Sequence, residues 1–189
     1  CYFQLAHGHP YHGPYHDREY GFPVIAEAKL FERLSLEIFQ AGLSWLTVLK
    51  KREAINEAFF NFDVDRVADL QTSEIASLLE NPKIIRNKLK IQAIRHNGHI
   101  IRSMRGSGGF ANWIEQQHPL SKPEWVATFK KSGFQFVGGE IVGEFLMSIG
   151  YLRPPHDEDC PIFKKQLALR PPWLTQQLVQ KCVGTTHAH

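Results

Sequence analysis

The sequence predicts an all-α protein, and three observations support this fold class. Along most of the chain, apolar residues recur at the spacings of three and four that one face of a helix requires. The alternating apolar and polar runs that are typical of strands are nearly absent. The composition, with 43% hydrophobic and 22% charged residues among 189, is ordinary for a globular protein with a real core. We expect one domain over residues 1–189, built from two helical lobes.

Two long helices come first in the periodic part of the chain. The segment "GFPVIAEAKLFERLSLEIFQA" predicts a helix that begins near Ala26 and ends at Gly42. Ser44 directly precedes "WLTVLKKREAINEAFFNF" and is predicted to be the N-cap of the second helix, since serine is a favoured capping residue. A short helix, "VADL", is then expected to begin at Asp63 or Asp65.

A helix, a tight turn and a basic helix follow. Thr72 or Ser73 is expected to cap "EIASLLE", and Pro82, in the turn "ENPK", is expected to start the next helix because proline suits a first helical position. Helix-hairpin-helix modules bind the DNA backbone with such a turn and the helix N-terminus after it. The turn lacks the glycines that are usual in these modules. The basic helix, "IIRNKLKIQAIRHNGHIIRSM", has apolar residues at Ile84, Ile91, Ile94 and Ile101.

The rest of the chain predicts three further helices and a tail. The helices are "FANWIEQQ", "EWVATFKKSG" and "GEIVGEFLMSIG", and the segment from residue 151 is a proline-broken tail with one more amphipathic stretch, "WLTQQLVQKC". No run of 18 apolar residues exists, so no membrane span is expected. The first residues are polar and rich in histidine, unlike a signal peptide, and three cysteines are too few for a disulfide scaffold. These features predict a cytoplasmic protein.

The basic residues are concentrated in one part of the sequence. The net charge is only +3, but no acidic residue occurs from Asn81 to Ile114. A local field of one sign suits a polyanion such as nucleic acid. A solvated helix face would have the same composition, so charge alone leaves both interpretations open. The seven basic residues of this segment are Lys83, Arg86, Lys88, Lys90, Arg95, Arg102 and Arg105.

Glu37 is the acidic residue that an ordinary amphipathic helix does not explain. Leu30, Leu34 and Ala41 share one helix face, and Glu37 lies on that face, three residues after Leu34 and four before Ala41. An inward carboxylate near Trp45 could hold a flat, cationic ring against aromatic faces. A carboxylate paired with an arginine in the core would give the same pattern. No G-x-S-x-G elbow, P-loop or H-E-x-x-H helix offers another catalytic centre.

Histidine and cysteine residues near both ends of the sequence could bind a metal. "HDEDC" places His156 and Cys160 four residues apart, a common spacing for two ligands. Cys1 and one of the N-terminal histidines, His9, His12 or His16, would complete a closed tetrahedral zinc site of the structural kind. The other interpretation is a buried thiol with histidine-rich termini that bind nothing.

Five blocks of sequence together resemble the 3-methyladenine DNA glycosylase I family. The similarity extends from Cys1 to about Cys160, and residues 161–189 match no motif. The resemblance implies an all-α fold of the helix-hairpin-helix glycosylase superfamily, with a zinc site that ties the N- and C-terminal segments together. The blocks are "YHDREYG" (15–21), "LEIFQAGLSWLTVLKKRE" (36–53), "IIRNKLKIQAI" (84–94), "KKSGFQFVG" (130–138) and "HDEDC" (156–160).

The resemblance also assigns residues to the metal and the base. Its zinc ligands fall on Cys1, His16, His156 and Cys160, which selects His16 among the N-terminal histidines, although the spacing from Cys1 to His16 is about two residues longer than is usual in the family. Its base pocket falls on Tyr15, Tyr20, Glu37 and Trp45. The family usually has tryptophan at position 20, so Tyr20 alters the expected stacking.

The implied reaction is hydrolysis of the N-glycosidic bond of 3-methyladenine, with the base flipped out of double-stranded alkylated DNA. Glu37 is the expected catalytic residue, and zinc is structural because four protein ligands leave no open position. Leu43 is expected to fill the gap in the stack, with a core leucine as the alternative. Lys83, Arg86 and Lys88 are expected to hold phosphates. The resemblance favours a monomer that releases the base without cutting the strand.

Two other functions are weighed against the glycosylase. A zinc-dependent hydrolase would use the histidine-rich N-terminus as an open metal site with three protein ligands. A non-catalytic DNA-binding homologue would keep the hairpin and the zinc site without the base pocket. The presence of Glu37, Tyr15 and Trp45 argues against the second.

Overall fold

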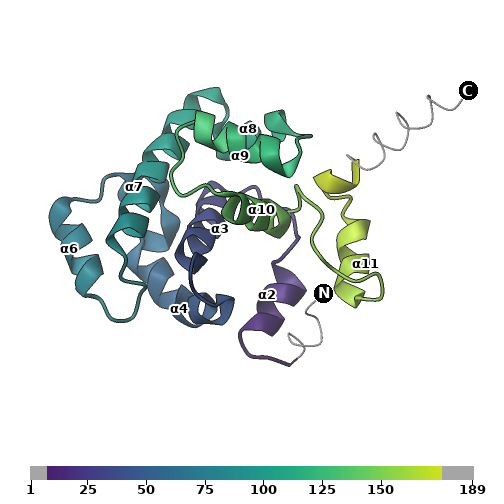
Figure 1. Cartoon of the computed structure of the whole chain (residues 1–189), viewed down its shortest axis with the longest axis horizontal. Coiled ribbons are helices and arrows are strands. Elements are labelled where there is room, and N and C mark those ends of the chain that lie inside the picture. The colour runs from purple at the N-terminus through teal and green to yellow at the C-terminus, as the bar shows by residue number, and fades with distance from the viewer. Residues whose placement is uncertain (1–7, 176–189) are drawn as a thin grey trace, which may run out of the picture. The chain divides into compact units, whose positions relative to one another are not determined.

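The computed structural model describes residues 8–175, and over this range the chain is helical and contains no strand, which confirms the all-α prediction (Figure 1). None of the helices described is both long and apolar enough to cross a membrane. In chain order the helices are α2 (His12–Arg18), α3 (Glu27–Gln40), α4 (Trp45–Ala58), η1 (Phe60–Phe62), α5 (Val64–Ala68), α6 (Thr72–Glu80), α7 (Lys88–Ser103), η2 (Met104–Ser107), α8 (Gly109–Gln117), α9 (Lys122–Lys131), α10 (Gly139–Ser148) and α11 (Pro161–Ala168).

The chain divides into two compact units. One unit is Ile25–Phe145, which holds the helices from α3 to α9 and most of α10. The other combines Cys1–Val24 with Leu146–His189 and holds α2 and α11. The single-domain interpretation stays a prediction, and each unit is described below by itself.

Helix α3 is the central helix of the first unit. Its predicted range differs from the observed one by one residue at the start and two at the end. It stops at Gln40 because Ala41 adopts a ψ of 113° and Gly42 a φ of +80°. Every residue from Leu30 to Phe39 is buried, so the helix is covered all round rather than along one stripe. Ala41, which the periodicity places on the inward stripe, is exposed because it lies beyond the helix end.

Helix N-caps agree only in part with the sequence prediction. Ser44 and Asp63 cap α4 and α5 as expected, and each side chain accepts from the backbone N–H three residues further on. The N-cap of α6 is Gln71 rather than Thr72 or Ser73. The reason is a reciprocal pair of bonds between Gln71 and the glutamate at the third helical position, a capping box.

The hairpin between α6 and α7 is longer than the sequence suggests. Pro82 does not begin a helix, contrary to the prediction. Residues 81–87 form the turn, and Asn81 Oδ1 accepts from the backbone N–H of Lys83 at 3.0 Å. Helix α7 begins at Lys88, where Asn87 Oδ1 accepts from the Lys90 N–H at 3.1 Å. The four predicted apolar positions, Ile84, Ile91, Ile94 and Ile101, are all buried.

Glu32 joins α3 to α4 inside the first unit. Its carboxylate, 1% exposed, accepts from Arg52 Nε at 2.9 Å, Asn56 Nδ2 at 2.7 Å and Lys29 Nζ at 2.8 Å. Burial alone would raise the pKa of Glu32, but the charge of Arg52 and these hydrogen bonds lower it to about 2. The buried charge is therefore fully compensated.

Replacing Glu32 by glutamine is expected to destabilise the protein by about 2–3 kcal/mol at pH 7, because a lowered carboxyl pKa contributes stability to the folded state. The contribution is complete above the unfolded pKa of 4.5 and is lost as the pH falls toward about 2. Urea unfolding at pH 7 and pH 3 measures the difference. If Glu32→Gln and the unmodified protein were equally stable at pH 7, the lowered pKa of Glu32 would not contribute to folding as expected.

The second unit contains the two helices that the sequence analysis missed, α2 and α11. Proline occupies the first position of α11, directly after Cys160. The apolar residues around this helix are Cys160, Ile162, Phe163 and Trp173, which form one buried cluster. The chain is helical again from 172 to 175, and the rest of the amphipathic segment predicted at 173–182 lies outside the described residues.

Candidate active site

Glu37 is buried in the first unit, as its position on the apolar stripe of α3 predicts. Its side chain is 4% exposed, and Leu34 on the same face is fully buried. Burial and the negative charge of Glu144 on α10 raise the pKa of Glu37, Arg33 lowers it, and the net result is a pKa of about 8. The carboxyl group therefore holds its proton at neutral pH. The charge of Arg33 lowers the pKa of Glu37, but by less than burial and Glu144 raise it. Glu37 therefore does not have the lowered pKa that a strong ion pair with Arg33 would give it.

A protonated Glu37 has chemical options that a surface carboxylate does not have. The neutral acid can donate one hydrogen bond and accept others, as an adenine edge requires. A cation placed beside the group would favour the carboxylate and lower its pKa. The charge that the sequence analysis assigns to Glu37 would therefore develop only when a cationic ligand is bound.

The turn after α3 places an apolar side chain in solvent. Gly42, at φ +80°, has no atom within 4 Å of where a Cβ would be, and the Leu43 N–H donates to Gln40 O at 2.6 Å. Leu43 is 42% exposed, which excludes the alternative of a core leucine. Trp45, half-buried, is the first residue of α4. An exposed leucine and a half-buried tryptophan thus flank the Ser44 N-cap.

Tyr15 and Tyr20 lie in the second unit, where both are buried. Tyr15 is on α2, and its ring centroid is 5.8 Å from that of Tyr20, with 47° between the ring planes. The ring of Tyr20 is also 6.0 Å from the His156 imidazole. The substitution at position 20 therefore lies beside the candidate metal ligands as well as beside Tyr15.

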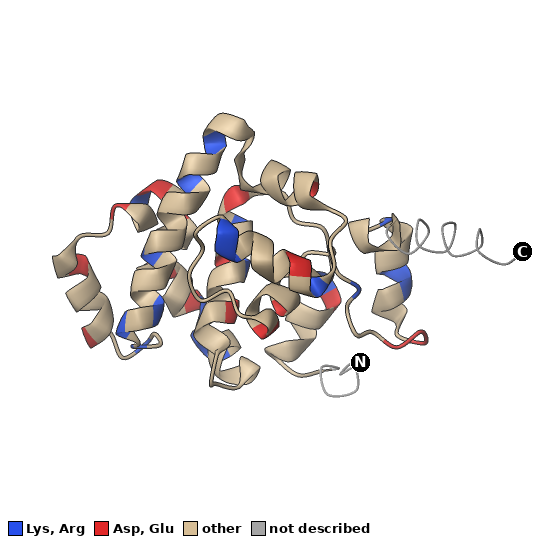
Figure 2. Cartoon of the chain, turned by 45° about the horizontal axis from the view of Figure 1, so that its top comes forward, with Lys and Arg blue, Asp and Glu red and all other residues tan. Residues whose placement is uncertain are grey.

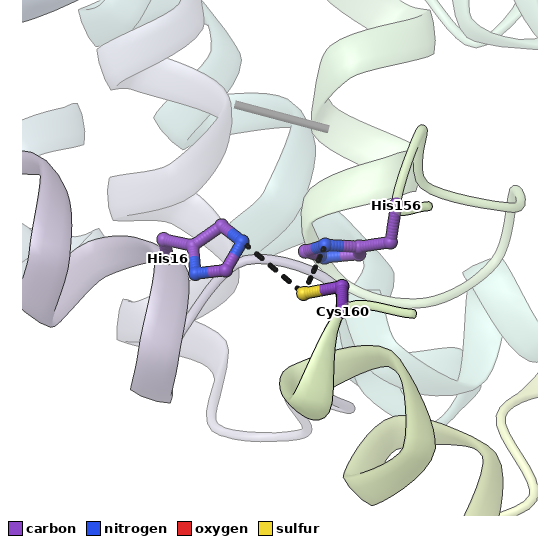
Figure 3. A group of neighbouring side chains, drawn as sticks. All are labelled: His16, His156 and Cys160. Carbon is purple, nitrogen blue, oxygen red and sulfur yellow. Dashed lines mark hydrogen bonds between the residues drawn. The ribbon is translucent and has the colours of Figure 1, made fainter. Parts of the chain in front are cut away.

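Three of the four predicted metal ligands come together in the second unit (Figure 3). The ligand atoms of His16, His156 and Cys160 lie within 4.8 Å of one another, and all three residues are buried. Cys160 Sγ is 3.8 Å from His16 Nε2 and 3.8 Å from His156 Nδ1. Tetrahedral zinc with bonds of about 2.3 Å to sulfur and 2.0 Å to nitrogen would place such atoms about 3.5 Å apart. Cys1, the fourth predicted ligand, lies outside the described residues.

The two imidazoles are oriented by groups that the sequence analysis did not name. Asp17 Oδ1 is 2.8 Å from His16 Nδ1, which directs Nε2 of the same ring toward Cys160. The Tyr20 backbone hydrogen-bonds the His156 ring and also accepts from Gln166 Nε2 at 2.6 Å. Burial and the charge of His16 lower the pKa of His156 to about 4, so this imidazole is neutral, the form that binds metals. Asp17 was visible in the "YHD" motif, whereas no local pattern marks Gln166.

The basic segment divides into an exposed part and a compensated part. Lys83, Arg86 and Lys88, in the hairpin turn and at the start of α7, are exposed as DNA binding would require. Figure 2 shows basic residues along α7, but Lys90 is 5% exposed and its Nζ is bound by backbone carbonyls. Arg95 Nε, further along α7, donates to Ala68 O at 3.3 Å.

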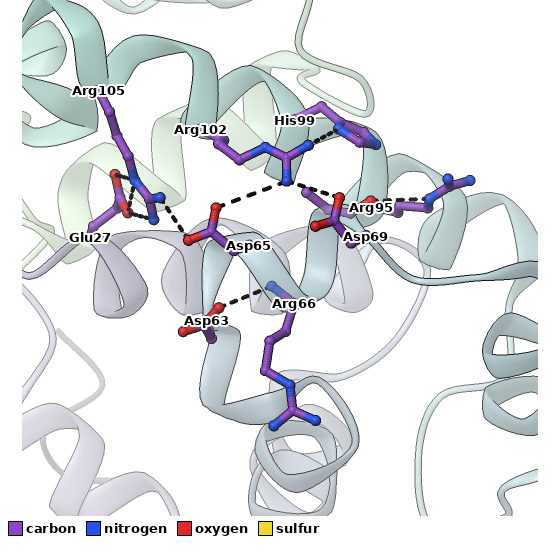
Figure 4. A network of polar contacts seen from close by, with 10 residues as sticks. Glu27, Asp63, Asp65, Arg66, Asp69, Arg95, His99, Arg102 and Arg105 are labelled. Carbon is purple, nitrogen blue, oxygen red and sulfur yellow. Dashed lines mark hydrogen bonds and ion pairs between the residues drawn. The ribbon is translucent and has the colours of Figure 1, made fainter.

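Acidic residues from other helices are paired with arginines at the end of α7 and in the following η2 (Figure 4). Arg102 is 2.9 Å from Asp69 Oδ1, and Arg105 is 2.7 Å from both Asp65 Oδ2 and Glu27 Oε2. The positive charges of Arg102 and Arg105 are therefore paired with carboxylates, whereas Lys83, Arg86 and Lys88 are exposed and have no ion pair within the part of the chain that the structure describes. The sequence does not reveal this pairing, because the carboxylates come from α3, from α5 and from the end of α5, which are remote in the sequence from the arginines.

Comparison with known proteins finds consistent similarities. Residues 6–164 match the sequence model for methyladenine glycosylase. DNA-3-methyladenine glycosylase of Haemophilus influenzae is 36% identical over 171 residues, covering 78% of this chain and 89% of that protein. DNA-3-methyladenine glycosylase 1 of Escherichia coli is 36% identical over 160 residues, covering 75% and 86%. A solved variant of 3-methyladenine DNA glycosylase I in complex with 3-methyladenine has a TM-score of 0.75 at 29% identity, covering 85% of this chain and 97% of that one.

Proposed function

The chain belongs to the methyladenine glycosylase family, and from that premise we propose that it hydrolyses the N-glycosidic bond of 3-methyladenine in double-stranded alkylated DNA. The observation that carries the proposal is the burial of Glu37 on α3, where its pKa is raised, next to the exposed turn with Leu43 and the half-buried Trp45. A carboxyl group without a dominant ion-pair partner in a core is expensive unless it serves a ligand.

The substrate explains why a carboxyl and aromatic rings suffice. 3-Methyladenine in a nucleotide is cationic, so the base leaves with the glycosidic electron pair and needs no proton from an acid. Water then adds to the sugar carbon and gives its proton to the solvent. Glu37 accepts hydrogen bonds from the base edge and complements its charge, while Trp45 stacks on it at roughly 0.5–2 kcal/mol per ring. Tyr15 and Tyr20 are proposed to contribute the remaining aromatic contacts.

DNA contact is assigned to the hairpin and the turn at 41–44. Leu43, exposed at 42%, fills the space that the flipped nucleotide leaves. Lys83, Arg86 and Lys88 bind phosphates without reading sequence. The enzyme is monofunctional, because Lys90, the buried lysine among the described residues, has its Nζ held by two carbonyls rather than offered as a nucleophile. We assign the protein to the cytoplasm as a monomer.

The metal is proposed to be structural zinc, bound by Cys1, His16, His156 and Cys160. Two thiolates and two imidazoles form a closed tetrahedral set that supplies folding free energy rather than an activated water. Asp17 and the Tyr20 backbone keep His16 and His156 in the orientation that ligation needs. This assignment separates the proposal from the zinc-dependent hydrolase, which would lose activity on chelation before it lost its fold.

The direct test is release of 3-methyladenine from methylated duplex DNA, followed by chromatography of the free base. We expect multiple turnovers, with an alkali-labile abasic site left and no strand cut before alkali. DNA binding with no base released would favour the non-catalytic homologue. Strand cleavage without alkali, trapped by borohydride as a protein adduct, would contradict the monofunctional assignment.

Changing Lys83, Arg86 and Lys88 together to alanine is expected to weaken duplex binding and to reduce the slope of log K against log salt by about 2.7, since each phosphate contact contributes about 0.9. The matched control removes Arg102 and Arg105, whose charges Asp69, Asp65 and Glu27 already compensate. Filter binding across salt concentrations measures both slopes. A slope that stays the same in the triple variant would mean that these side chains are only a solvated face.

A further inference from the structure

We propose that Lys90 and Lys51 are positioning residues that brace the turn at 41–44 against the α6–α7 hairpin, so that phosphate binding by the hairpin sets the position of Leu43. This inference rests on the proposed glycosylase function. It concerns lysines to which neither the metal nor the base pocket assigns a role. All the residues involved lie in the first unit.

Lys90 reaches from α7 to the end of α3. Its Nζ donates to Phe39 O at 2.8 Å and to Ala41 O at 2.5 Å, across 51 and 49 residues of chain. These carbonyls belong to the last turn of α3 and to its C-cap, Ala41, and have no partner within the helix. The carbonyl between them, Gln40 O, accepts from the Leu43 N–H at 2.6 Å. Three consecutive carbonyls are thus bound, and this fixes the path of the chain into Gly42 and Leu43.

The charge of Lys90 suits this place. A helix C-terminus carries a partial negative charge, so an ammonium group there stabilises the helix. The residue is 5% exposed, and its aliphatic stem is covered as well. A buried amine in the first turn of α7 would be costly without these acceptors, so its position depends on the end of α3.

Lys51 makes the reciprocal connection, from α4 to the hairpin. Its Nζ donates to Pro82 O at 2.9 Å and to Lys83 O at 3.1 Å. Helix α4 begins directly after the turn and has Lys51 as its seventh residue, so Lys90 fixes the turn on its α3 side and Lys51 fixes the helix that follows the turn. Two pairs of charge-assisted hydrogen bonds therefore join the same two segments in opposite directions.

The braces lie next to the residues proposed to touch DNA. Lys83 offers its side chain to solvent while its carbonyl binds Lys51, and Lys88 is two residues from Lys90. On the other side, Leu43 is two residues from Ala41. The hydrogen bonds of Lys51 and Lys90 therefore connect the proposed phosphate-binding residues of the hairpin to the turn that holds Leu43. A side chain positioned before the encounter loses less freedom on insertion, which makes flipping more favourable.

The test compares Lys51→Met with Lys50→Met. Both changes remove one positive charge from α4, but Lys50 is exposed and outside the brace. We expect Lys51→Met, which removes two charge-assisted hydrogen bonds to backbone carbonyls, to lower base release from duplex DNA by about tenfold, the low end of what one such bond contributes. Release of the same lesion from single-stranded DNA, which needs no insertion, should change little. Lys90→Met should show the same pattern more strongly. If Lys90→Met fails to fold because the residue is buried, the comparison of Lys51→Met with Lys50→Met still tests the proposal.

Insertion itself is measured without chemistry, by the fluorescence of 2-aminopurine beside a stable abasic analogue in duplex DNA. The signal should depend on Leu43, fall in Lys51→Met and persist in Lys50→Met. Because the brace acts through Leu43, adding Lys51→Met to Leu43→Ala should cause no further loss. Additive losses, equal losses on single-stranded DNA, or no Leu43-dependent signal in the unmodified protein would each overturn the proposal. Insertion without base release would instead contradict the glycosylase function alone.

Discussion

Glu37→Gln is expected to lower release of 3-methyladenine by about ten- to a hundredfold, the equivalent of one charge-assisted hydrogen bond of roughly 1.5–3 kcal/mol. Glutamine can accept through its carbonyl, as the carboxyl does, but it cannot become an anion beside a cationic base. The loss should therefore appear in base release on the cationic lesion. Single-turnover release from methylated duplex at pH 7 is the measurement.

The same variant is expected to be more stable than the unmodified protein at high pH. The folded pKa of Glu37, about 8, lies above its ordinary value of 4.5, so the folded state holds the proton more tightly. Stability consequently falls as the pH rises from 4.5 through about 8, and glutamine removes that dependence. At pH 9 the gain should be about 5 kcal/mol, since each unit of pKa difference is worth about 1.4 kcal/mol, and at pH 5 it should be below about 1 kcal/mol.

Glu32 provides the matched control for Glu37, since both are buried glutamates on α3 with opposite shifts of pKa. Glu32→Gln should lose stability at pH 7, whereas Glu37→Gln should not. If Glu37 were a structural partner of Arg33, its variant would instead melt earlier at pH 7 and keep normal base release. A Glu37→Gln variant whose stability matches that of the unmodified protein at both pH 5 and pH 9, and which keeps full base release, would contradict both interpretations.

Cys160→Ser is expected to reduce bound zinc from one ion per chain to well below half, and to lower the melting temperature by roughly 10 °C or more. Serine is a poor zinc ligand, and the change also opens the buried cluster that Cys160 shares with Ile162, Phe163 and Trp173. Metal analysis and thermal unfolding of the same sample measure the two effects. A chelator should lower the melting temperature of the unmodified protein toward that of the variant.

Cys182→Ser is the control for this experiment, since it removes a thiol that is not in the proposed ligand set. It should leave the zinc content at one ion. Less than about half an ion in the unmodified protein would contradict the site. Full zinc in Cys160→Ser would remove Cys160 from the ligands. Chelation that abolished base release at an unchanged melting temperature would favour the zinc-dependent hydrolase.

Helical periodicity predicted the parts of the fold that depend on local sequence. The long helices α3, α4 and α7 and the burial of Glu37 follow from spacing, and Ser44 follows from capping preference. Helices α2 and α11 were missed because histidines and prolines hide short helices that tertiary contacts stabilise. Pro82 was placed wrongly because proline favours turns as well as first helical positions.

The residues that local patterns could not supply are those defined by distant partners. Lys90 is a basic residue in a basic segment, and only the carbonyls of Phe39 and Ala41 distinguish it. Glu32 resembles any helix glutamate until Arg52 and Asn56 are placed beside it. Gln166 has no signal at all, since its partner is the Tyr20 carbonyl, 146 residues away. Long-range polar contacts of this kind leave no period in a sequence.

The compensated arginines at the end of α7 bear on how the protein would meet a long polyanion. A helix of sixteen residues is about 24 Å long, more than two Debye lengths at physiological ionic strength. The hairpin at one end and the neutral cluster of Arg102 and Arg105 at the other therefore act independently on approaching DNA. Random collisions would be biased toward those that present the hairpin first, and the neutral end would not hold the duplex in unproductive orientations. If Lys83, Arg86 and Lys88 bind phosphate as proposed, the exposed turn at 41–44, joined to the same hairpin by Lys51 and Lys90, would approach the duplex together with them.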